Sequence, residues 1–586
     1  MPARSACQVG VLSHLNDEKG SFTMGSGGSG LSRRTLLRTS ALGAGAAAVG
    51  APLLAACGSS ASASGGVSSN NLKTALPDYV PLGAGVKADL PSVTGANGAL
   101  TDPGYLSYPT NLVKTVSQVP GSGGSYSAIT PLWGSIPPAD NAYYQAVDKA
   151  LGANVTVNPA NGNTYNNTVP TLVAGNKLPD WIQIPSWWNS TLNVGELAAG
   201  KFADLTPYLS GSNIRKYPNL AAIPTGGWEA GAWEGKLHGI PSFVTGQAFA
   251  DALYFRKDVF DAKGIDPDDV KTADDLYHLG AELTAPKANV WAFDVLWLMI
   301  QQMYAVPSGD FYVQDGKVHS SFEAPEMIPA LEFAYKLAKS GYVHPDALAN
   351  DTSNATQRFY SGKELVQPGG TGGWNVMDAQ QGQAANPAYV RGAFKLFSSD
   401  GSTPTIALGP STSEISYLNK SLSSSQIEEC LSIANYLAAP FGSYEYTLLN
   451  YGVEGVDWAM GKNGPTYTNT GQKESNQQTY QFLCSAQSVV NNPGYPSVTQ
   501  AYCAWSADSV KYAYKPAFWN MNITVPTRFS SVSTAQEVRD IILQVTCGTK
   551  TVGDFQAAVR SWKSSGGDSM VAWYQSNVYD KYGTGQ

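Results

Sequence analysis

The chain has 586 residues, more than one ordinary core accommodates, and this length indicates two lobes or more. Hydrophobic residues make up 43 % of the sequence, whereas charged residues make up only 14 %, against about 25 % in a typical soluble domain. The net charge of −8 excludes the basic footprint that nucleic-acid binding requires, and the polar, weakly charged composition is more typical of an exported protein than of a cytosolic enzyme.

The N-terminus has the order of an export signal. Arg33 and Arg34 precede a mild apolar stretch, residues 39–56, which ends in the small residues before Cys57. Cationic, then apolar, then small residues is the order of a secretory signal, and the twin arginine resembles the Tat signal. The alternative, a short buried helix, is disfavoured by the glycines and the proline of the stretch.

We therefore expect residues 1–56 to be a Tat-type lipoprotein signal peptide, with Met24 as a possible true translation start. The run Leu54-Ala55-Ala56-Cys57 forms a lipobox, which predicts that Cys57 is lipidated and anchors the mature protein to the membrane. No later run reaches the roughly 18 apolar residues that a membrane span needs.

The next stretch, residues 57–124, lacks helical or strand periodicity. Residues 58–66 are Gly, Ser and Ala only, and Gly, Pro and Ser remain frequent up to residue 124. Such a composition is typical of a flexible tether or spacer, with extended pieces laid on a domain surface.

Strands and helices alternate from Tyr126 onward. Helical spacing puts Tyr144, Val147 and Leu151 on one face, and Gly175 suits a helix end. Alternating strands and helices predict a parallel sheet. The expected strands are residues 127–133, 154–157 and 179–184, and the expected helices are residues 141–151 and 168–174.

Further elements follow along the chain. Thr272 is a suitable N-cap for an amphipathic helix with acidic residues in its first turn. We expect strands at residues 235–241 (a turning pair), 253–258, 364–367 and 523–525, and helices at residues 259–263, 272–283 and 425–437.

Four pieces of this sequence, in order behind the lipobox, resemble the extracellular solute-binding proteins of ABC sugar importers, in particular the large lipoprotein type. The resemblance covers roughly Tyr126 to Tyr582. The four pieces are Leu178-Pro179-Asp180 entering a strand, the segment from Gly235 to Pro241 with Leu253 to Asp258 and the helix near Thr272, Asn450 to Gly455, and the C-terminal run from Gly553 to Tyr582.

The resemblance implies an α/β fold, namely a two-lobe periplasmic-binding-protein-like fold with a hinge and a ligand cleft between the lobes. It implies chain crossings near residues 243–250, near residues 397–405 and after Gly455. The expected lobes are residues 125–245 with 401–455, and residues 246–400 with 456–586.

The resemblance also implies a function. It predicts capture of a carbohydrate on the extracellular face of the bacterial membrane and delivery to the permease subunits of an ABC importer, by a lipid-anchored monomer without catalytic activity. Some relatives carry a calcium loop after the helix that ends near Thr284, but this chain has Ala285-Pro286-Lys287-Ala288-Asn289 there. These residues lack ligand spacing, so we expect no metal, and we expect no cofactor.

Sugars present apolar C–H faces and a rim of hydroxyls, so a sugar site needs aromatic rings and polar side chains. Trp374 and Asn375 follow a glycine-rich loop at a strand end, where similar proteins carry a stacking Trp. We expect Trp374 to contact ligand, with core packing as the alternative.

Other aromatic candidates lie at strand ends. Trp187 and Trp188 are adjacent, and since both cannot point inward from an extended chain, Trp187 is the favoured ligand contact, with a surface contact as the alternative. Trp133 and Trp519 are further candidates against a structural role. The polar candidates near the crossings are Gln247, Asp251 and Glu454, each with a capping or hinge role as the alternative.

Four cysteines follow the lipobox: Cys430, Cys484, Cys503 and Cys547. An even number in an exported chain permits two disulfides with three connectivities. Cys484 and Cys503 flank a segment of turn residues and are the favoured pair, while four buried free thiols are the alternative.

Two other functions remain open at this stage. The sequence contains no nucleophile elbow and no metal-spaced histidine pair, but a surface-anchored glycoside-active enzyme needs only two carboxylates among the 45 acidic residues. An adhesion or signalling lipoprotein is the second alternative. The sequence does not specify the sugar or its chain length, and it does not exclude a peptide.

Overall fold

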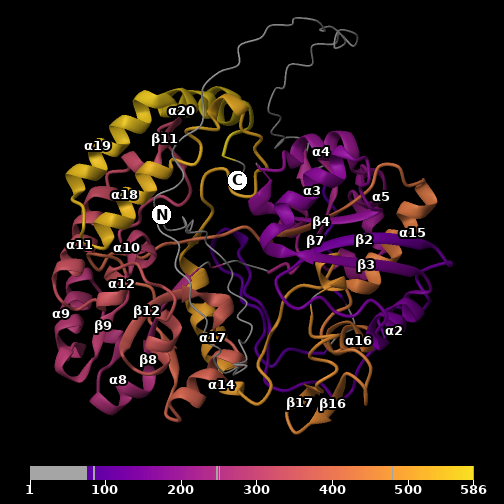
Figure 1. Cartoon of the computed structure of the whole chain (residues 1–586), viewed down its shortest axis with the longest axis horizontal. Coiled ribbons are helices and arrows are strands. Elements are labelled where there is room, and N and C mark those ends of the chain that lie inside the picture. Colours follow the sequence, from indigo (N-terminus) through magenta and orange to yellow (C-terminus); the bar gives the residue numbers. More distant parts are fainter. Residues whose placement is uncertain are drawn as a thin grey trace, which may run out of the picture. The chain divides into compact units, whose positions relative to one another are not determined.

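The computed structural model describes residues 75–82, 86–189, 191–245, 249, 251–477 and 479–584. Two sheets, each with its own helices, organise these residues into the two-lobe α/β fold that the sequence predicts (Figure 1). The sheet of the first lobe has the order β3-β2-β4-β15-β7. Its strands are β2 (Ser125–Leu132), β3 (Asn154–Asn161), β4 (Trp181–Pro185), β7 (Gly239–Ser242) and β15 (Glu414–Leu418).

The first sheet is mixed in direction. β2 runs parallel to β3 and β4, whereas β15 runs antiparallel to both β4 and β7. The carboxyl ends of β2, β3, β4 and β7 therefore meet at one edge of the sheet, where β15 begins. We call this the carboxyl edge of the first sheet.

Alternating side chains of the strands supply two separate cores. Ala128 and Trp181 pack in one hydrophobic cluster, while Ile182 and Ile415 pack in another on the opposite face. This period of two follows from the strand pleat. Both faces of the sheet are therefore buried.

Helices cover the two faces of the first sheet. Asn141 accepts a hydrogen bond from the backbone N–H of Tyr144 at 2.7 Å and begins the first helix, which ends at Gly152 in the left-handed conformation (φ +64°). The helices of this lobe are α2 (Ala142–Leu151), α3 (Tyr165–Ala174), α4 (Val194–Lys201), α5 (Thr206–Leu209), α6 (Pro218–Ala221), α7 (Thr225–Glu229), α15 (Ser424–Leu437) and α16 (Tyr444–Tyr451). Two short strand pairs complete it: β5 (Ala232–Trp233) with β6 (Lys236–Leu237), and β16 (Trp458–Gly461) with β17 (Gly464–Tyr467).

The second lobe is built on a sheet of order β13-β8-β12-β9. Here β12 runs parallel to β9 and antiparallel to β8. The strands are β8 (Asp251–Arg256), β9 (Trp291–Phe293), β12 (Glu364–Gly370) and β13 (Arg391–Ala393), and a hairpin of β10 (Phe311–Gln314) and β11 (Lys317–Ser320) lies beside them in sequence.

The second lobe contains the longest hydrophobic cluster of the described residues, and the C-terminal helices pack into it. Thr272 accepts from the N–H of Asp275 and begins α9, as the sequence predicts. The helices are α8 (Lys257–Lys263), α9 (Ala273–Leu283), α10 (Trp297–Met303), α11 (Met327–Lys339), α12 (Pro345–Leu348), α13 (Ala355–Tyr360), α14 (Val376–Ala385), α18 (Gln536–Thr546), α19 (Val552–Trp562), α20 (Asp568–Tyr574) and α21 (Asp580–Tyr582).

The chain passes between the lobes more than once. It leaves the first sheet after Ser242 and enters the second sheet at Asp251, and it returns between Ala393 and Glu414. The next passage was expected after Gly455, and this boundary is wrong. Tyr480, Leu483 and Cys484 still pack in the core of the first lobe with α15, so the first lobe extends to residue 484 because their apolar side chains complete its core.

After residue 484 the chain forms β18 (Val490–Asn491), α17 (Pro496–Ser509) and β19 (Ala513–Tyr514). Trp505 of α17 packs with Tyr254 of β8 and with Ile406 of β14 (Ile406–Ala407), which pairs with β19. Residues 523–525, expected as a strand, form no strand. Ile523 and Val525 pack against the core of the second lobe, while the side-chain amide of Asn522 donates to the carbonyls of Ala230 and Ala232 in the first lobe.

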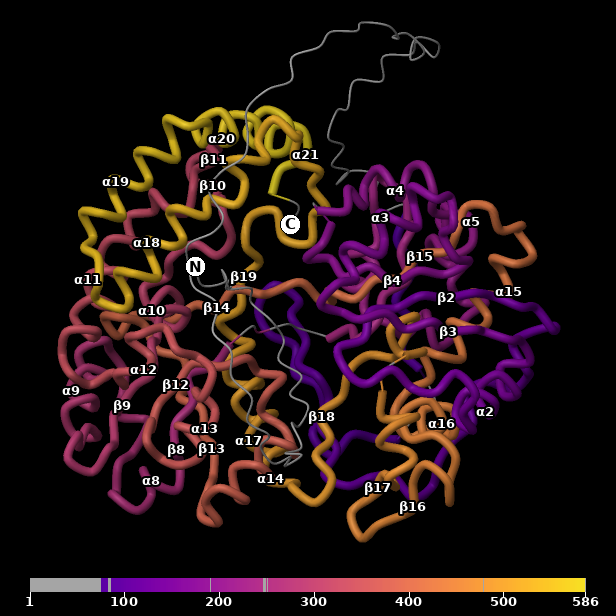
Figure 2. The backbone as a smooth tube through the Cα atoms, in the orientation of Figure 1, coloured from indigo at the N-terminus to yellow at the C-terminus, as the bar shows by residue number. Residues whose placement is uncertain are grey.

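The described part of the predicted tether is packed, which corrects the expectation of a flexible spacer for residues 75–82 and 86–124. β1 (Gly104–Tyr105) pairs with β18, and Figure 2 shows this N-terminal tube beside β18. Ala99 lies in the cluster of Trp505, whereas Tyr108 packs on Phe441 of the first lobe. The segment therefore contacts both lobes. Residues 57–74, with Cys57, lie outside the described residues.

Among the helices that the structure describes, none has the length and apolar character needed to cross a bilayer.

Candidate functional site

Aromatic side chains gather at the carboxyl edge of the first sheet. Trp133 follows β2 directly, and Trp187 follows β4 in a short 3-10 helix, η3 (Ser186–Trp188). The ring centroids of these two residues are 5.9 Å apart. Trp188 stacks on Trp133 at 6.4 Å, and Phe482 lies 6.1 Å from Trp133. We call Trp133, Trp187 and Trp188 the tryptophan cluster.

Burial assigns different roles within the tryptophan cluster. Trp188 is 8 % exposed and stacks on Tyr165 of α3 at 5.7 Å, so it anchors the cluster in the core. Trp187 is 46 % exposed and offers an open indole face. One indole of the adjacent pair is thus buried and the other is not, but a helical turn separates them rather than strand alternation.

A glycine permits the close packing of this cluster. Gly162 follows β3, the third neighbouring strand, and a Cβ added there would lie 2.4 Å from the indole of Trp133. Any side chain at this position would displace the ring. The carboxyl ends of three neighbouring strands therefore jointly position Trp133, which is partly exposed.

Polar groups accompany the tryptophans at this edge. The backbone N–H of Ser186 donates to the carbonyl of Ser413 at 2.8 Å, which joins the segment before Trp187 to the start of β15. Glu414, the first residue of β15, accepts a hydrogen bond from the side-chain amide of Gln183 of β4. Burial raises the pKa of Glu414 to about 7, while the hydrogen bond from Gln183 opposes the shift. Glu414 was not among the residues expected from the sequence; its one local signal is an acidic residue at the start of a buried strand.

In the second lobe the structure brings Asp251, Trp374 and Asn375 to one end of the sheet. Asp251 begins β8 and pairs in register with Gly370 at the end of β12. Asp251 is partly exposed, and burial raises the pKa of its carboxyl. Asn375 caps α14 by accepting from the backbone N–H groups of Met377 and Asp378.

Trp374 is 5 % exposed. Its ring lies edge-on to Tyr254 at 5.5 Å and to Tyr502 at 5.9 Å. In this conformation both neighbours cover the indole, so the packing role that the sequence left open describes Trp374 better than an exposed stacking surface.

Trp519 belongs to a segment that touches the first lobe. Its indole N–H donates to the carbonyl of Gly409 at 2.8 Å, and the ammonium of Lys515 lies 4.6 Å from its ring centroid. The amide of the next residue, Asn520, donates to Gly226 and Glu229 of α7. Trp519 is partly exposed and lies beside the chain that enters β15.

Of the two other polar candidates, the structure describes one, Glu454. Glu454 is exposed in the turn before β16. It forms an isolated bridge with Trp458 and belongs to neither of the two large sheets. Gln247 lies outside the described residues.

The predicted disulfides are absent from the described part of the chain, which corrects the pairing of Cys484 with Cys503. All four thiols are free. Cys430 and Cys484 are buried in the core of the first lobe, whereas Cys503 lies on α17 and Cys547 ends α18. The favoured pair is not joined because Cys484 lies in the core of the first lobe, whereas Cys503 lies on α17 beside Gly104.

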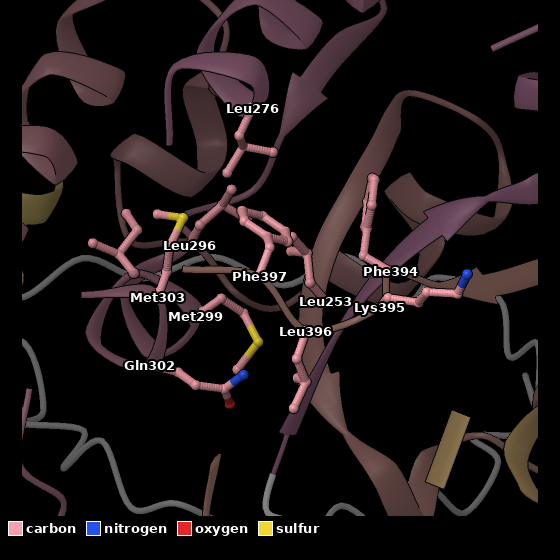
Figure 3. Close-up of a pocket in the computed structure, with 11 residues that line it drawn as sticks. Leu253, Leu276, Leu296, Met299, Gln302, Met303, Phe394, Lys395, Leu396 and Phe397 are labelled. Carbon is pink, nitrogen blue, oxygen red and sulfur yellow. The ribbon is translucent and has the colours of Figure 1, made fainter. Parts of the chain in front are cut away.

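A pocket in the second lobe lies among apolar side chains and is not suited to a sugar. Leu276 of α9, Met299 of α10 and Phe397 line it together with Leu253 of β8, and Figure 3 shows these side chains around the space. Gln302 and Lys395 are the polar members of the lining. Hydroxyl groups placed there would lose hydrogen bonds to water without replacement.

Known proteins that resemble this chain are solute-binding proteins. Residues 133–409 match the family model described as bacterial extracellular solute-binding protein. The predicted resemblance is confirmed. A polygalacturonan/rhamnogalacturonan-binding protein of Bacillus subtilis is 21 % identical over 489 residues, which cover 78 % of this chain and 93 % of that protein.

Solved solute-binding proteins share the fold. An HMO-binding, ABC-transporter-associated protein of Bifidobacterium longum infantis superposes with a TM-score of 0.58 at 13 % identity and covers 79 % of this chain and 99 % of its own. A substrate-binding protein of S. pneumoniae in complex with kestose gives a TM-score of 0.55 at 13 % identity, over 79 % of this chain and 100 % of that one. The tryptophan cluster therefore belongs to a solute-binding protein fold.

Proposed function

We propose that this solute-binding protein captures an oligosaccharide outside the cell and delivers it to an ABC importer. The observation that carries the proposal is that the half-exposed indole of Trp187 and the partly exposed carboxyl group of Glu414 lie on segments that one backbone hydrogen bond joins at the carboxyl edge of the first sheet. An aromatic face with adjacent hydrogen-bonding groups suits the apolar and hydroxylated sides of a sugar ring. The sugar specificities of the matched proteins support the same class of ligand.

In this proposal, residues of both lobes contact the ligand. Trp187 and Trp133 supply the aromatic surface, and Trp519, Asp251 and Asn375 approach from the second lobe and its connections. Binding that uses both lobes stabilises a closed arrangement over an open one. The protein acts as a monomer and returns the sugar intact, since capture requires no bond cleavage.

A sugar panel tests the proposal. We would measure the melting temperature with arabinotriose, kestose, maltotriose and an oligogalacturonide, because a ligand that binds the folded state raises it by mass action. We expect at least one sugar to raise the melting temperature. That sugar should be recovered unchanged after overnight incubation with the protein. Released reducing ends would instead indicate a glycoside-active enzyme, and no rise with any sugar would contradict carbohydrate capture.

The cellular location is part of the proposal. Residues 1–56 act as a Tat-type signal, and Cys57 carries the lipid that holds the protein at the outer face of the membrane. The variant Cys57→Ser should appear in the culture medium or accumulate unprocessed, as fractionation and blotting would show. Full retention of the variant in the membrane fraction would contradict the anchor.

A further inference from the structure

A row of polar side chains lies on one face of the first sheet at its carboxyl edge. Register places Thr130 of β2 beside Gln183 of β4, because Ala128 and Ile129 pair with Trp181 and Ile182. Gln183 in turn pairs with Ser416 of β15, two residues from Glu414. Side chains two residues apart share a strand face, so Thr130, Gln183 and Glu414 line the same face. We call them the polar row.

The inner two members of the polar row are buried and incompletely paired. Thr130 and Gln183 are 0 % exposed. The hydroxyl of Thr130 and the amide oxygen of Gln183 have no hydrogen-bond partner among the described residues, although the amide nitrogen of Gln183 donates to Glu414. A buried polar atom without a partner costs about 1–3 kcal/mol, so an arrangement with two of them suits a site that a further molecule completes.

The outer member of the polar row reaches solvent beside an indole. Glu414 is partly exposed, and the hydrogen bond from Ser186 to Ser413 fixes it next to the turn that carries Trp187. Gln183 holds one of its carboxylate oxygens. The side chains of Glu414 and Trp187 thus supply a hydrogen-bonding group and an apolar face from adjoining chain segments.

Among the described residues, the two strands that pair with β15 carry no charged side chain. β4 and β7 have no titratable residue, and their groups nearest in register are Pro185 and Ser242. The 3-10 helix η9 (Tyr480–Phe482) contributes Tyr480, and β15 itself contributes Tyr417 on the opposite face of the sheet. Burial raises the pKa of both phenols above its ordinary value. Both phenols stay neutral near pH 7, so Glu414 is the group in this set that titrates there.

We propose that Glu414 contacts the bound sugar, with Gln183 as its positioning residue, and that its ionisation makes sugar capture depend on pH near neutrality. This inference rests on the proposed function. A carboxylate accepts hydrogen bonds from sugar hydroxyls, and these charge-assisted bonds are stronger than those of a neutral carboxyl. Sugar therefore binds the ionised form better, and affinity rises with pH.

The expected change in sugar affinity follows from the fraction of molecules in which Glu414 is ionised. Burial raises the pKa of Glu414 to about 7, so most molecules hold a neutral carboxyl group at pH 5.5 and a carboxylate at pH 8.5. When only the ionised form binds well, the apparent affinity falls in proportion to the ionised fraction, which predicts roughly a thirtyfold gain in affinity from pH 5.5 to pH 8.5.

Calorimetric titration with neutral sugars tests the inference, because such ligands do not ionise themselves. We would titrate the whole mature protein, Glu414→Gln and Glu428→Gln with arabinotriose, kestose and maltotriose at pH 5.5, 7.0 and 8.5. Glu428 is a matched control, since its exposed carboxylate pairs with Lys216 at 2.6 Å on the surface of α15. The unaltered protein and the control should gain affinity with pH, whereas Glu414→Gln should bind weakly at every pH.

The outcomes separate the inference from the proposed function. Sugar binding that is independent of pH, that weakens with rising pH, or that keeps its pH dependence in Glu414→Gln would overturn the role of Glu414 and leave carbohydrate capture intact. Binding of no sugar from the wider panel at any pH would overturn the proposed function itself. Should Glu414→Gln fail to fold, Glu414→Asp retracts the carboxyl by one methylene, and it should lose affinity while it keeps the pH dependence.

Discussion

In the first lobe Trp187 is 46 % exposed at a sheet edge, whereas in the second lobe Trp374 is 5 % exposed at the corresponding kind of position. Trp187 lies within the 3-10 helix that follows β4, and Trp374 ends the 3-10 helix that follows β12. The difference lies in what covers them. Trp374 meets Tyr254 and Tyr502, while Trp187 meets Trp133 and Trp188 and still remains almost half exposed. The exposure of a tryptophan at a strand end is therefore set by the neighbouring elements and not by its position in the sequence.

The largest expected effect tests the buried side of this comparison. Trp374→Ala should destabilise the protein by about 3–5 kcal/mol, because it leaves a cavity between Tyr254 and Tyr502. Thermal unfolding measures the loss, and sugar affinity measured on the same variant separates packing from binding. An unchanged melting temperature with lost affinity would restore Trp374 as a stacking residue and erase the contrast between the lobes.

The second prediction concerns the exposed side. Trp187→Ala should lower sugar affinity by about 1–3 kcal/mol, or roughly ten- to a hundredfold, while the melting temperature stays nearly constant. Tyr444→Ala is the control, since Tyr444 is 60 % exposed on the same lobe and lies at the start of α16. Equal affinities for Trp187→Ala and the control would remove the tryptophan cluster from the site.

The strands and helices near the first sheet could be read from the sequence because their signals are local. Asn141, Thr272 and the apolar spacing between Tyr144 and Leu151 specify helix ends and faces within a few residues. The same locality explains why the sequence places Trp133 and Trp187 at strand ends, since each follows a strand whose signal is local.

The remaining features depend on contacts between distant residues. The burial of Trp374 depends on Tyr502, more than a hundred residues later, and the packing of Tyr480 and Cys484 in the first lobe depends on α15. Glu414 gains its environment only when β15 inserts between β4 and β7. No periodicity within one segment encodes such neighbours, so the lobe boundary, the packed N-terminal segment and the polar row required the structure.

A third prediction uses the titration of Glu414 without ligand. The pKa of Glu414 is about 7 in the folded protein, above the ordinary 4.5, so the folded state binds more protons than the unfolded state between these values. Stability should therefore fall as pH rises from 4.5 to 7 and then level off. Because the group is partly exposed, we expect a loss of about 1–2 kcal/mol relative to Glu414→Gln. Urea unfolding of both proteins at pH 4.5 and 8 measures the difference; parallel curves would place Glu414 in open solvent.

The smallest expected effect compares the thiols of the two lobes. Cys430 and Cys484 are buried in the core of the first lobe, whereas Cys503 and Cys547 are partly exposed. Burial raises the pKa of Cys503 to about 11, with a further contribution from Asp102, and burial also raises the pKa of Cys547. Because the thiolate is the reactive form, all four should react slowly in the folded protein, and Cys503 and Cys547 should react before the two core thiols. Alkylation without reductant, followed by mass spectrometry, measures this order.

Unfolding the protein without reductant should then expose all four thiols to the reagent, as it would after treatment with a reductant. If Cys484 and Cys503 are labelled only after reduction, a disulfide joins them, and the separation of Cys484 in the core from Cys503 on α17 does not hold in the exported protein.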